Sequence, residues 1–338
     1  MPDAMPGAGG SLHHEALFYG TAAEYVEGIG DFIRAGLAAG EPVCVAVPLA
    51  RRHLLWERIP TDAARVRFVD MDVVGRNPSR IIPTISAFVN AHPDRRVRFI
   101  GEPIWNGRSP AETIEATRHE ALLNLSFADM AIRILCPYDT VGLSPAILAD
   151  AERNHPILHA HEHRTRSTPY ADPRVVHAAV DRPLAERPPD ARSLAFGRDD
   201  LSAVLSFVWH GAHGAGMASG RIRDLLSAVS ELIMNTIAHA GGYGTVATWP
   251  ERDGTGLVCE VRDAGHIADP LVGRVAPRPG SVQSERGLWL VNQVCDLVEV
   301  RSSRAGTIVR LHLWDQPAPH EGATIRPTEQ DARSDALG

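Results

Sequence analysis

The stretch SELIMNTIAH, residues 230–239, decides how the second half of this chain is interpreted. Glu231, Asn235 and His239 recur every four residues, so an α-helix would place them on one polar stripe. A carboxylate, an amide and an imidazole on one stripe suit a metal ion and a phosphate. Standing alone, such a stripe is more often a solvated helix face. Three apolar residues of the same stretch would turn towards a core: Leu232, Ile233 and Ile237.

The size and charge of the chain limit its function. At 338 residues it is long enough for two domains of about 150 residues each. Hydrophobic residues make up 44% and charged residues 22%, which is typical of a globular protein. The formal net charge of −7 argues against nucleic-acid binding, because such domains carry an excess of basic residues that neutralise phosphates. A protein or nucleotide partner fits better.

The cysteines and apolar runs indicate the compartment. The four cysteines form no CxxC pair, so they indicate neither a zinc site nor a disulfide framework: Cys44, Cys136, Cys259 and Cys295. No apolar run approaches the ~20 residues of a membrane span, and MPDAMPGAGG lacks the features of a signal peptide. We expect a cytoplasmic protein without a membrane partner, whose ends, residues 1–11 and 315–338, are disordered.

The first half, residues 12–163, alternates short apolar runs with longer amphipathic ones. This order is typical of an α/β domain, a mostly parallel sheet with helices on both faces. Strands are expected at Pro42–Pro48, Arg65–Met71, Val97–Pro103 and Met130–Tyr138. Helices are expected at Thr21–Ala39, Ala50–Arg58, Pro78–Ala91, Pro110–Ser126 and Ser144–Asn154. A strand such as VCVAV is apolar throughout, as expected for burial on both faces.

Ligands of parallel α/β sheets bind beyond the carboxyl ends of the strands. That edge would hold Asp70, Asp72, Glu102, Trp105 and Asp139. No phosphate-loop or dinucleotide motif follows the strand at 42–48, where PLARRHLL stands instead, so nothing here requires a nucleotide. Strand-end carboxylates are more often helix caps or loop residues than ligands.

The segment HPILHAHEHR contains four histidines: His155, His159, His161 and His163. Histidines can ligate zinc, but zinc requires tetrahedral geometry, and no cysteine or second ligand cluster lies nearby in sequence. A helix end and a solvated connector is therefore the preferred interpretation. The prolines between residues 164 and 192 then indicate an interdomain linker, because proline interrupts helices and central strands.

The opening run HHEALFYGTAAEYVEGIGDFIRAGLAAGEPVCVAV places His14 and Tyr19 before a helix and a Gly-Glu pair before a strand. In these features the first half resembles the MEDS family, named after methanogen, methylotroph and dichloromethane-regulator proteins. The resemblance covers about residues 12–160 and implies a sensory role and a fold like that of nucleotide-binding α/β proteins. It leaves open which small-molecule ligand is sensed.

The second half, residues 193–314, has an α+β order in which helices would cover one face of a mixed, largely antiparallel sheet. Strands are expected at Ser193–Gly197, Thr245–Pro250, Leu257–Asp263, Leu297–Ser302 and Thr307–Leu313. Helices are expected at Asp199–His213, Arg221–Ala240 and Arg286–Val294. The polar stripe lies in the second of these helices.

Three further features accompany the stripe. Asp263 ends a strand before Ala264 and Gly265, so its carboxylate could accept a hydrogen bond from the amine of adenine. Gly287 would lie at the start of a helix, where free amides and the helix dipole favour phosphate. Thr307 opens a late strand, where its hydroxyl could complete the adenine contact.

Taken in order, these motifs resemble the GHKL ATPase domain, in its branch of anti-sigma-factor serine kinases. Four boxes match: Glu231, Asn235 and His239; Asp263 and Gly265; Arg286, Gly287 and Leu288; Gly306 and Thr307. Four motifs in the right order are a specific signal, whereas one alone would be weak. The resemblance implies that these boxes bind ATP with Mg²⁺. Asn235 would coordinate Mg²⁺, Glu231 would be the general base and Asp263 would bind adenine.

The chain departs from this family pattern in two places. The first glycine box usually reads DxGxG, but DAGHIADP puts Ile267 where the second glycine would stand. Glu285 precedes Arg286 and Gly287 where the family often has Gly-Arg-Gly, and its carboxylate would repel a triphosphate unless turned away or paired with magnesium. ATP binding is still expected, and the catalytic rate is left open. Residues 269–284 would form a mobile lid.

The preferred hypothesis is a regulatory switch in which the sensory half biases the ATP-binding half. The ATP-binding half would act as a serine/threonine kinase on a STAS-type anti-sigma-factor antagonist, would sequester a sigma factor, or both. The alternative is a nucleotide-dependent binding module without kinase activity. A histidine-kinase-like sensor is weaker, because the proline-rich segment leaves no room for a dimerising hairpin and His210 lacks an acidic neighbour. Homodimerisation is left open.

Overall fold

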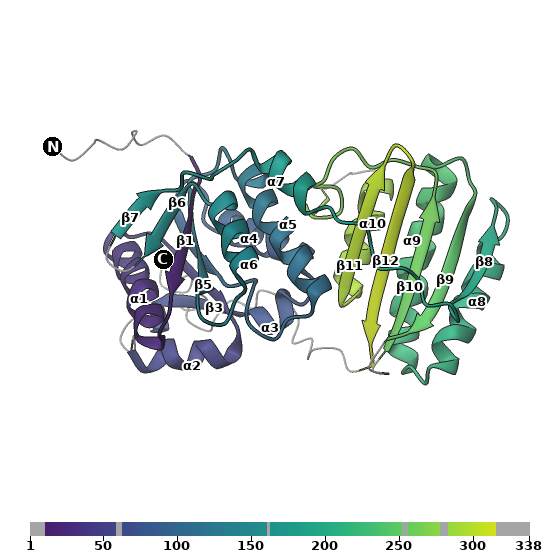
Figure 1. Cartoon of the computed structure of the whole chain (residues 1–338), viewed down its shortest axis with the longest axis horizontal. Coiled ribbons are helices and arrows are strands. Elements are labelled where there is room, and N and C mark those ends of the chain that lie inside the picture. Colours follow the sequence, from purple (N-terminus) through teal and green to yellow (C-terminus); the bar gives the residue numbers. More distant parts are fainter. Residues whose placement is uncertain are drawn as a thin grey trace, which may run out of the picture.

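The computed structural model of the chain describes residues 11–58, 63–160, 163–251, 254, 256–277 and 283–315. It contains two sheets side by side, each with its own helices (Figure 1). The ends predicted to be disordered lie outside the described residues, apart from Ser11 and Asp315. No helix within these ranges combines the length and the apolar character needed to cross a membrane.

The first sheet has seven strands in the order β3-β2-β4-β5-β1-β6-β7. Neighbouring strands are parallel except β6 and β7, which form an antiparallel pair at one edge. The strands are β1 (His13–Tyr19), β2 (Val43–Val47), β3 (Val66–Asp70), β4 (Val97–Gly101), β5 (Ile132–Asp139), β6 (Ile157–Ala160) and β7 (His163–Arg166). The expected mostly parallel sheet is confirmed.

Helices cover both faces of this sheet. They are α1 (Ala22–Ala38), α2 (Leu49–Arg58), α3 (Met71–Val74), α4 (Ile81–Asn90), α5 (Pro110–Ser126), α6 (Pro145–Asn154) and α7 (Pro173–Val180), with 3-10 turns at Ala63–Arg65 and Pro78–Arg80. In β2, Cys44 and Ala46 join an apolar cluster with α4, α5 and α6, whereas Val43, Val45 and Val47 join another with α1 and α2. Because successive side chains of a strand point to opposite faces, this all-apolar strand requires a helical layer on each side.

Capping boxes set the first residues of α1 and α5. Thr21 accepts a hydrogen bond from the backbone N–H of Glu24, and the carboxylate of Glu24 accepts one from the backbone N–H of Thr21. Ser109 and Glu112 form the same reciprocal pair before α5. Such boxes satisfy backbone donors that a helix start leaves free, so both helices begin where the sequence predicts, to within a residue.

The structure adds three strands that the apolar pattern does not predict: β1, β6 and β7. β1 lies inside the sheet, between β5 and β6, although it begins with three polar residues. Glu15 of β1 is buried because its carboxylate pairs with His159 of β6 and Arg164 of β7. Residues 155–163, expected as a helix end and solvated connector, therefore contribute an edge hairpin, and His161 lies outside the described residues.

The second sheet has five strands in the order β11-β12-β10-β9-β8. Its strands are β8 (Arg192–Phe196), β9 (Gly244–Pro250), β10 (Gly256–Asp263), β11 (Leu297–Ser303) and β12 (Gly306–Trp314). Every neighbouring pair of these strands is antiparallel, so the sheet is fully antiparallel. The sequence predicts a mixed, largely antiparallel sheet, and only the mixed part of that prediction is wrong. Three helices cover one face, as predicted: α8 (Leu201–Gly214), α9 (Ser219–His239) and α10 (Gln283–Val294).

The opposite face of the second sheet, called the polar face below, carries buried charged residues beside the small apolar cluster of Ala247, Trp249 and Val258, and the chain segment before β8 covers it. Along β10 apolar side chains point to the helices, whereas the fully buried Glu260 points away from them. Its carboxylate pairs with Arg310 at 2.6 Å and with Arg187 at 2.6 Å. Arg187 belongs to the segment that crosses this face in Figure 1. Residues 164–192, expected as a linker, thus include the end of β7, helix α7 and a stretch packed on the sheet.

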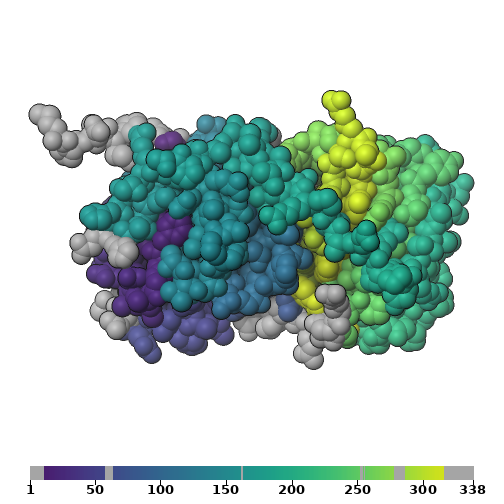
Figure 2. Space-filling view, in the orientation of Figure 1, coloured from purple at the N-terminus to yellow at the C-terminus, as the bar shows by residue number. Residues whose placement is uncertain are grey.

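The two halves of the chain contact each other directly, and helix α7 with the following segment lies across their boundary (Figure 2). The side-chain amide of Asn77 donates to the backbone oxygen of Asn292 at 3.0 Å, and Arg80 Nε donates to the same oxygen at 2.9 Å. Further along, Arg118 donates to the backbone oxygen of Val300 at 2.8 Å. These contacts join the region around α4 and α5 to α10 and β11.

Candidate functional site

Helix α9 carries the polar stripe seen in the sequence. Glu231 and Asn235 are half-buried, whereas His239, the last residue of the helix, is exposed. On the other side of the helix, Leu232 and Ile233 are buried in the core, and Ile237 packs against it. The predicted core-facing residues are confirmed, and the stripe lies at the margin of the core, where side chains can reach a ligand.

Helix α10 packs closely against this stripe at Gly287. A Cβ atom at this position would lie 2.9 Å from Glu231 Oε2 and 3.2 Å from Asn235 Nδ2, so a larger residue would force these side chains to move. The helix begins at Gln283 and not at Arg286, which places Gly287 in its second turn. The amide of Gly287 is therefore not among the free N–H groups of the helix start. Its role is to permit close approach of α10 to α9.

Asp263, Gly265 and Thr307 lie together at the ends of two paired strands. In the antiparallel register Asp263 of β10 faces Thr307 of β12. Asp263 accepts a hydrogen bond from the backbone N–H of Gly265 at 2.8 Å and from the hydroxyl of Thr236 at 2.7 Å. The Thr307 hydroxyl donates to the backbone oxygen of Gly265 at 2.9 Å. Each carboxylate oxygen of Asp263 keeps a second lone pair, so an exocyclic amine can still be bound.

Ile267 occupies the place of the second glycine of the first glycine box. Its backbone N–H donates to the hydroxyl oxygen of Ser302 at 2.7 Å, and its side chain packs against the apolar core. The same Ser302 oxygen lies 2.7 Å from the hydroxyl oxygen of Thr307. Ile267 therefore anchors the loop after β10 onto β11, where the family pattern would leave flexible backbone.

The other predicted residues lie around α10. Leu288 is buried, and a Cβ atom at Gly273 would meet Leu288 Cγ at 2.7 Å, so the loop before α10 also packs tightly on the helix. Arg286 is exposed. The side chain of Glu285 and residues 278–282 of the predicted lid lie outside the described residues.

The strand-end carboxylates of the first sheet have local partners. Asp70 caps α3, and Asp139 accepts hydrogen bonds from two backbone N–H groups of the turn that follows it. Glu102 is buried and accepts hydrogen bonds from the hydroxyls of Tyr19 at 3.2 Å and Tyr25 at 2.8 Å. Burial outweighs these hydrogen bonds and raises the pKa of Glu102 to about 7. Burial also raises the pKa of Asp70 above its usual value.

Comparisons with protein families agree with this architecture. Residues 13–156 match the family described as MEDS, the methanogen/methylotroph, DcmR sensory domain. Residues 197–313 match the histidine kinase-like ATPase domain. The chain combines a MEDS domain with a histidine kinase-like ATPase domain. The resemblances to the MEDS domain and to the GHKL-type ATPase domain are thereby confirmed, and the anti-sigma-factor branch stays a prediction.

Comparison with curated proteins gives no match. Among solved structures, the RsbU and RsbW domains of Rv1364c from Mycobacterium tuberculosis are similar at 18% identity and TM-score 0.27, over 38% of this chain and 34% of that one. The SiaB-SiaC complex from Pseudomonas aeruginosa is similar at 14% identity and TM-score 0.28, over 36% and 88%. The ATPase domain of G40P is similar at 9% identity and TM-score 0.30, over 44% and 68%. The chain thus spans about a third of the first of these structures.

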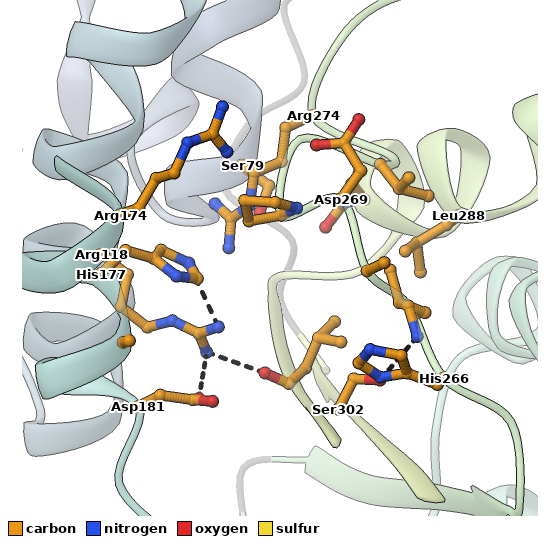
Figure 3. A pocket seen from close by; sticks show the side chains of 17 residues that line it. Ser79, Arg118, Arg174, His177, Asp181, His266, Asp269, Arg274, Leu288 and Ser302 are labelled. Carbon is orange, nitrogen blue, oxygen red and sulfur yellow. Dashed lines mark hydrogen bonds and ion pairs between the residues drawn. The ribbon is translucent and has the colours of Figure 1, made fainter. Parts of the chain in front are cut away.

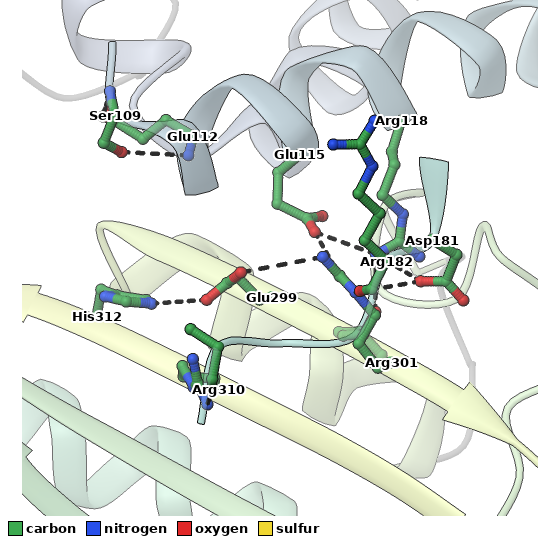
Figure 4. Close-up of polar contacts among 12 residues, drawn as sticks. Ser109, Glu112, Glu115, Arg118, Asp181, Arg182, Glu299, Arg301, Arg310 and His312 are labelled. Carbon is green, nitrogen blue, oxygen red and sulfur yellow. Dashed lines mark hydrogen bonds and ion pairs between the residues drawn. The ribbon is translucent and has the colours of Figure 1, made fainter. Parts of the chain in front are cut away.

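Glu115 of the MEDS domain lies at the boundary with the ATPase domain (Figure 4). Its carboxylate accepts hydrogen bonds from Arg118 at 3.1 Å, Arg274 at 3.2 Å and Arg301 at 2.7 Å. Burial alone would raise the pKa of Glu115, but the three guanidinium groups lower it below its usual value. The carboxylate therefore stays charged although it is only 1% exposed.

This ion-pair group ties the MEDS domain to the loop between β10 and α10. Arg274 lies between β10 and α10, in the segment predicted as the lid, and is itself buried. Single charges on α5 look like a solvated helix face in the sequence, so their spacing does not predict the group. The alternation in β11 is a signal in the sequence, because it places Glu299 and Arg301 on the face opposite Val298 and Val300.

The polar face of the ATPase sheet holds a second charged group next to this one. His312 lies between two carboxylates, with Nδ1 at 2.6 Å from Glu251 and Nε2 at 3.0 Å from Glu299. Burial lowers the pKa of His312, but the hydrogen bonds to both carboxylates outweigh it and raise the pKa to about 9. The imidazole is therefore charged at neutral pH.

A pocket of about 300 Å³ lies between the two domains (Figure 3). Residues of both domains line it, among them Arg118, Arg174, His177, His266, Ile267 and Ser302. Ser302 accepts a hydrogen bond from Ile267 and lies within hydrogen-bond distance of Thr307, so the pocket borders the Asp263–Thr307 pair of the ATPase domain. Burial, followed by the charge of Arg118, lowers the pKa of His177 to about 3, so its imidazole is neutral.

Proposed function

We propose that this chain is an ATP-binding regulator of the anti-sigma-factor type, whose MEDS domain controls its ATPase domain. One observation carries the proposal: Glu231 and Asn235 meet Gly287 at one end of α9, while Asp263 and Thr307 meet where β10 ends and β12 begins. The two groups belong to one edge of one domain. They offer oxygen and amide ligands at one end and a hydrogen-bond acceptor with a hydroxyl at the other.

Each group suits one part of ATP. Asp263 retains lone pairs for the amine of adenine, and the Thr307 hydroxyl lies beside it. Asn235 would hold Mg²⁺ through its amide oxygen, since hard cations prefer oxygen ligands. When bound, Mg²⁺ would neutralise part of the negative charge of the triphosphate. Gly287 keeps a side chain out of the space in front of Asn235, and exposed Arg286 lies one residue before it.

Glu231 would be the general base. It lies one helical turn before Asn235, so a base and a cation ligand share the same face of α9. Its carboxylate would take the proton of a serine or threonine hydroxyl while that oxygen bonds to the γ-phosphorus and the bond to the ADP oxygen breaks. The protein substrate would be a STAS-type anti-sigma-factor antagonist. Sequestration of a sigma factor would need binding alone.

Control by the MEDS domain would act through Arg274. This residue is buried and joins the loop before α10 to Glu115 of α5. A change in the MEDS domain that moves Glu115 would also move this loop. Gly273 of the loop packs closely against Leu288 of α10, so the movement would reach that helix. The sensory domain therefore has a direct contact to a segment next to the nucleotide site.

Phosphorylation assays separate the kinase from the binding module. The full chain is incubated with labelled ATP and candidate antagonist proteins, and phosphoserine or phosphothreonine is counted. We expect transfer that Glu231→Ala abolishes while nucleotide affinity is kept. Asp224→Asn, which neutralises an exposed carboxylate on the same helix, is the matched control and should retain transfer. Tight ATP binding without transfer to any antagonist would favour the binding module.

Nucleotide binding itself is tested at Asn235. Asn235→Ala removes the proposed Mg²⁺ ligand, so calorimetry should show weaker ATP binding in Mg²⁺ and a smaller loss in EDTA. The half-buried position of Asn235 at the core margin makes a folding defect small, which circular dichroism can check. Unchanged affinity in Mg²⁺ would overturn the assignment of this helix to the nucleotide site.

A further inference from the structure

Four side chains with metal-binding atoms meet inside the MEDS domain. His14 comes from β1, Glu120 from α5, Cys136 from β5 and His155 from the residue after α6. Their ligand atoms all lie within 4.8 Å of one another. Each of the four residues is at most 1% exposed, so the group lies in the dry interior of the domain.

Hydrogen bonds fix the same tautomer on both imidazoles. His155 Nδ1 lies 2.7 Å from the backbone oxygen of Ala151, which can only accept, so Nδ1 carries the proton. His14 Nδ1 lies 3.1 Å from Asn124 Oδ1. The amide of Asn124 is oriented because its Nδ2 donates to the backbone oxygen of Asn154 at 2.9 Å. Both Nε2 atoms are therefore left with a lone pair.

These two lone pairs face an acceptor. His14 Nε2 lies 3.2 Å and His155 Nε2 3.0 Å from the same Oε2 of Glu120. The Cys136 thiol, 3.4 Å from His14 Nε2, can donate to one imidazole, which leaves the other facing the carboxylate. Within the described residues, His155 Nε2 and both oxygens of Glu120 have no hydrogen-bond partner. Buried acceptors so arranged repel one another unless a positive charge lies between them.

Protons fill this role poorly. Protonating both imidazoles would bury two positive charges against one carboxylate, which is costly in a dry interior. Protonating Glu120 supplies a single O–H donor, which serves only one of the two nitrogens. Protonating His155 alone pairs it with Glu120 but leaves the lone pair of His14 Nε2 3.2 Å from the same carboxylate oxygen. A cation at the centre would satisfy all four side chains at once.

The separations suit a tetrahedral ion of borderline softness. Metal bonds of about 2.0–2.1 Å to nitrogen or oxygen and about 2.3 Å to sulfur give ligand separations of roughly 3.3 Å and, to sulfur, roughly 3.6 Å. The separations from Glu120 Oε2 to the two Nε2 atoms, 3.2 and 3.0 Å, and from His14 Nε2 to Cys136 Sγ, 3.4 Å, lie close to these values. Thiolate and imidazole disfavour Mg²⁺ and Ca²⁺.

Charge and surroundings agree with this geometry. Two neutral imidazoles, one thiolate and one carboxylate balance a divalent cation, so the loaded site would be electrically neutral. Binding would release one proton, that of the Cys136 thiol, to solvent. The Nδ1–H hydrogen bonds of both histidines, to a backbone oxygen and a side-chain amide, are the outer contacts that orient metal-bound histidines.

We propose that His14, Glu120, Cys136 and His155 bind one divalent transition-metal ion of the Zn²⁺ class in the core of the MEDS domain. Sequence spacing does not reveal this set of four, because Cys136 and His14 are 122 positions apart. His155 is the member of the histidine-rich segment that takes part, whereas His163 is exposed on β7. The site is separate from the Mg²⁺–ATP site proposed on α9.

The test uses the full chain, stripped with a chelator and titrated with Co²⁺ or Zn²⁺ in the absence of nucleotide. We expect one ion per chain by elemental analysis, a near-ultraviolet thiolate-to-cobalt band and the visible bands of tetrahedral cobalt. Cys136→Ser should abolish the thiolate band, and Cys44→Ser, which changes another buried cysteine, should keep it. Cobalt at Asn235 would give no thiolate band, so the two sites are distinguished.

A second variant keeps the test decisive if Cys136→Ser folds poorly. His155→Gln should weaken Zn²⁺ binding at least about tenfold, whereas His163→Gln should leave it unchanged. Zn²⁺ should also raise the melting temperature of the stripped wild-type chain but not that of His155→Gln. Absence of the thiolate band in wild type, or Zn²⁺ binding that survives both ligand substitutions, would overturn the proposal.

Discussion

Neutralising Glu115 should separate the two domains. Glu115→Gln keeps the size of the side chain but removes the charge that faces Arg118, Arg274 and Arg301 at 3.1, 3.2 and 2.7 Å. Arg118 and Arg301 keep Asp181 as a second acidic partner, at 3.4 and 3.2 Å. Arg274, 5% exposed, would lose its ion pair and remain buried unless the domains part.

The size of the effect follows from this burial. Breaking one partner of a buried ion pair costs about 3–5 kcal/mol, and the glutamine oxygen can still accept one hydrogen bond, so the lower end applies. A loss of about 3 kcal/mol corresponds to roughly a hundredfold shift in the equilibrium between docked and separated domains. Separation of the two domains returns the guanidinium group of Arg274 to water. The variant therefore avoids the free-energy cost of an unpaired buried charge when the interface opens.

Two measurements check this expectation. Urea unfolding should change from one joint transition to two, or lose about 3 kcal/mol, and small-angle scattering should show a larger radius of gyration. Asp31→Asn is the control, because its ion pair with Arg34 joins side chains that are 70% and 52% exposed. That pair should contribute less than about 1 kcal/mol. If Glu115→Gln changes stability and shape no more than Asp31→Asn, the interface reasoning is refuted.

Three further predictions concern pH and one glycine. The folded pKa of Glu102 is raised to about 7 from 4.5, so its contribution to stability is present below pH 4.5 and is lost as pH rises through 7. The loss amounts to about 3 kcal/mol. Urea unfolding at pH 5 and 8 should show this loss in the wild-type chain but not in Glu102→Gln. The folded pKa of His312 is raised to about 9 from 6.5, so its contribution is present below pH 6.5 and is lost as pH rises through 9, which His312→Gln should abolish in thermal melts. Gly306→Ala places a Cβ 2.5 Å from the backbone oxygen of Asp263 at a φ of +132°. It should lower the free energy of unfolding by about 1–3 kcal/mol and weaken ATP binding, as urea unfolding and calorimetry can measure. The control Gly107→Ala, with a φ of +101° and open space around the Cβ, should show the effect of backbone strain alone.

The sequence predicts those parts of the fold whose stability is local. VCVAV in β2 is apolar at every position, and Thr21 and Ser109 begin helices through capping boxes that need residues only three positions away. The apolar pattern does not predict β1, because its sequence HHEALFY begins with three polar residues. Its buried Glu15 is compensated by Arg164, 149 positions later, and no periodicity within one segment can reveal such a partner.

The same distinction holds for the sites. Glu231 and Asn235 share one helical face, so spacing alone places them together, and their closeness to Gly287 then follows from family resemblance. The interface at Glu115 depends on Arg274 and Arg301, which lie 159 and 186 positions away. Only the packing of the two domains brings these charges together, and the sequence of α5 does not reveal their burial, because its apolar and charged residues form no distinct faces.

Helix α5 has a consequence for signalling that follows from its surroundings. Ten consecutive residues, from Glu115 to Asn124, are buried, so the helix is enclosed on every side. Glu115 contacts the ATPase domain, and Glu120, about 7.5 Å further along the axis, faces the two histidines in the MEDS core. Because both carboxylates belong to one enclosed helix, we expect a rigid shift of α5 to move them together. We therefore expect α5 to connect the core of the MEDS domain mechanically to the loop between β10 and α10.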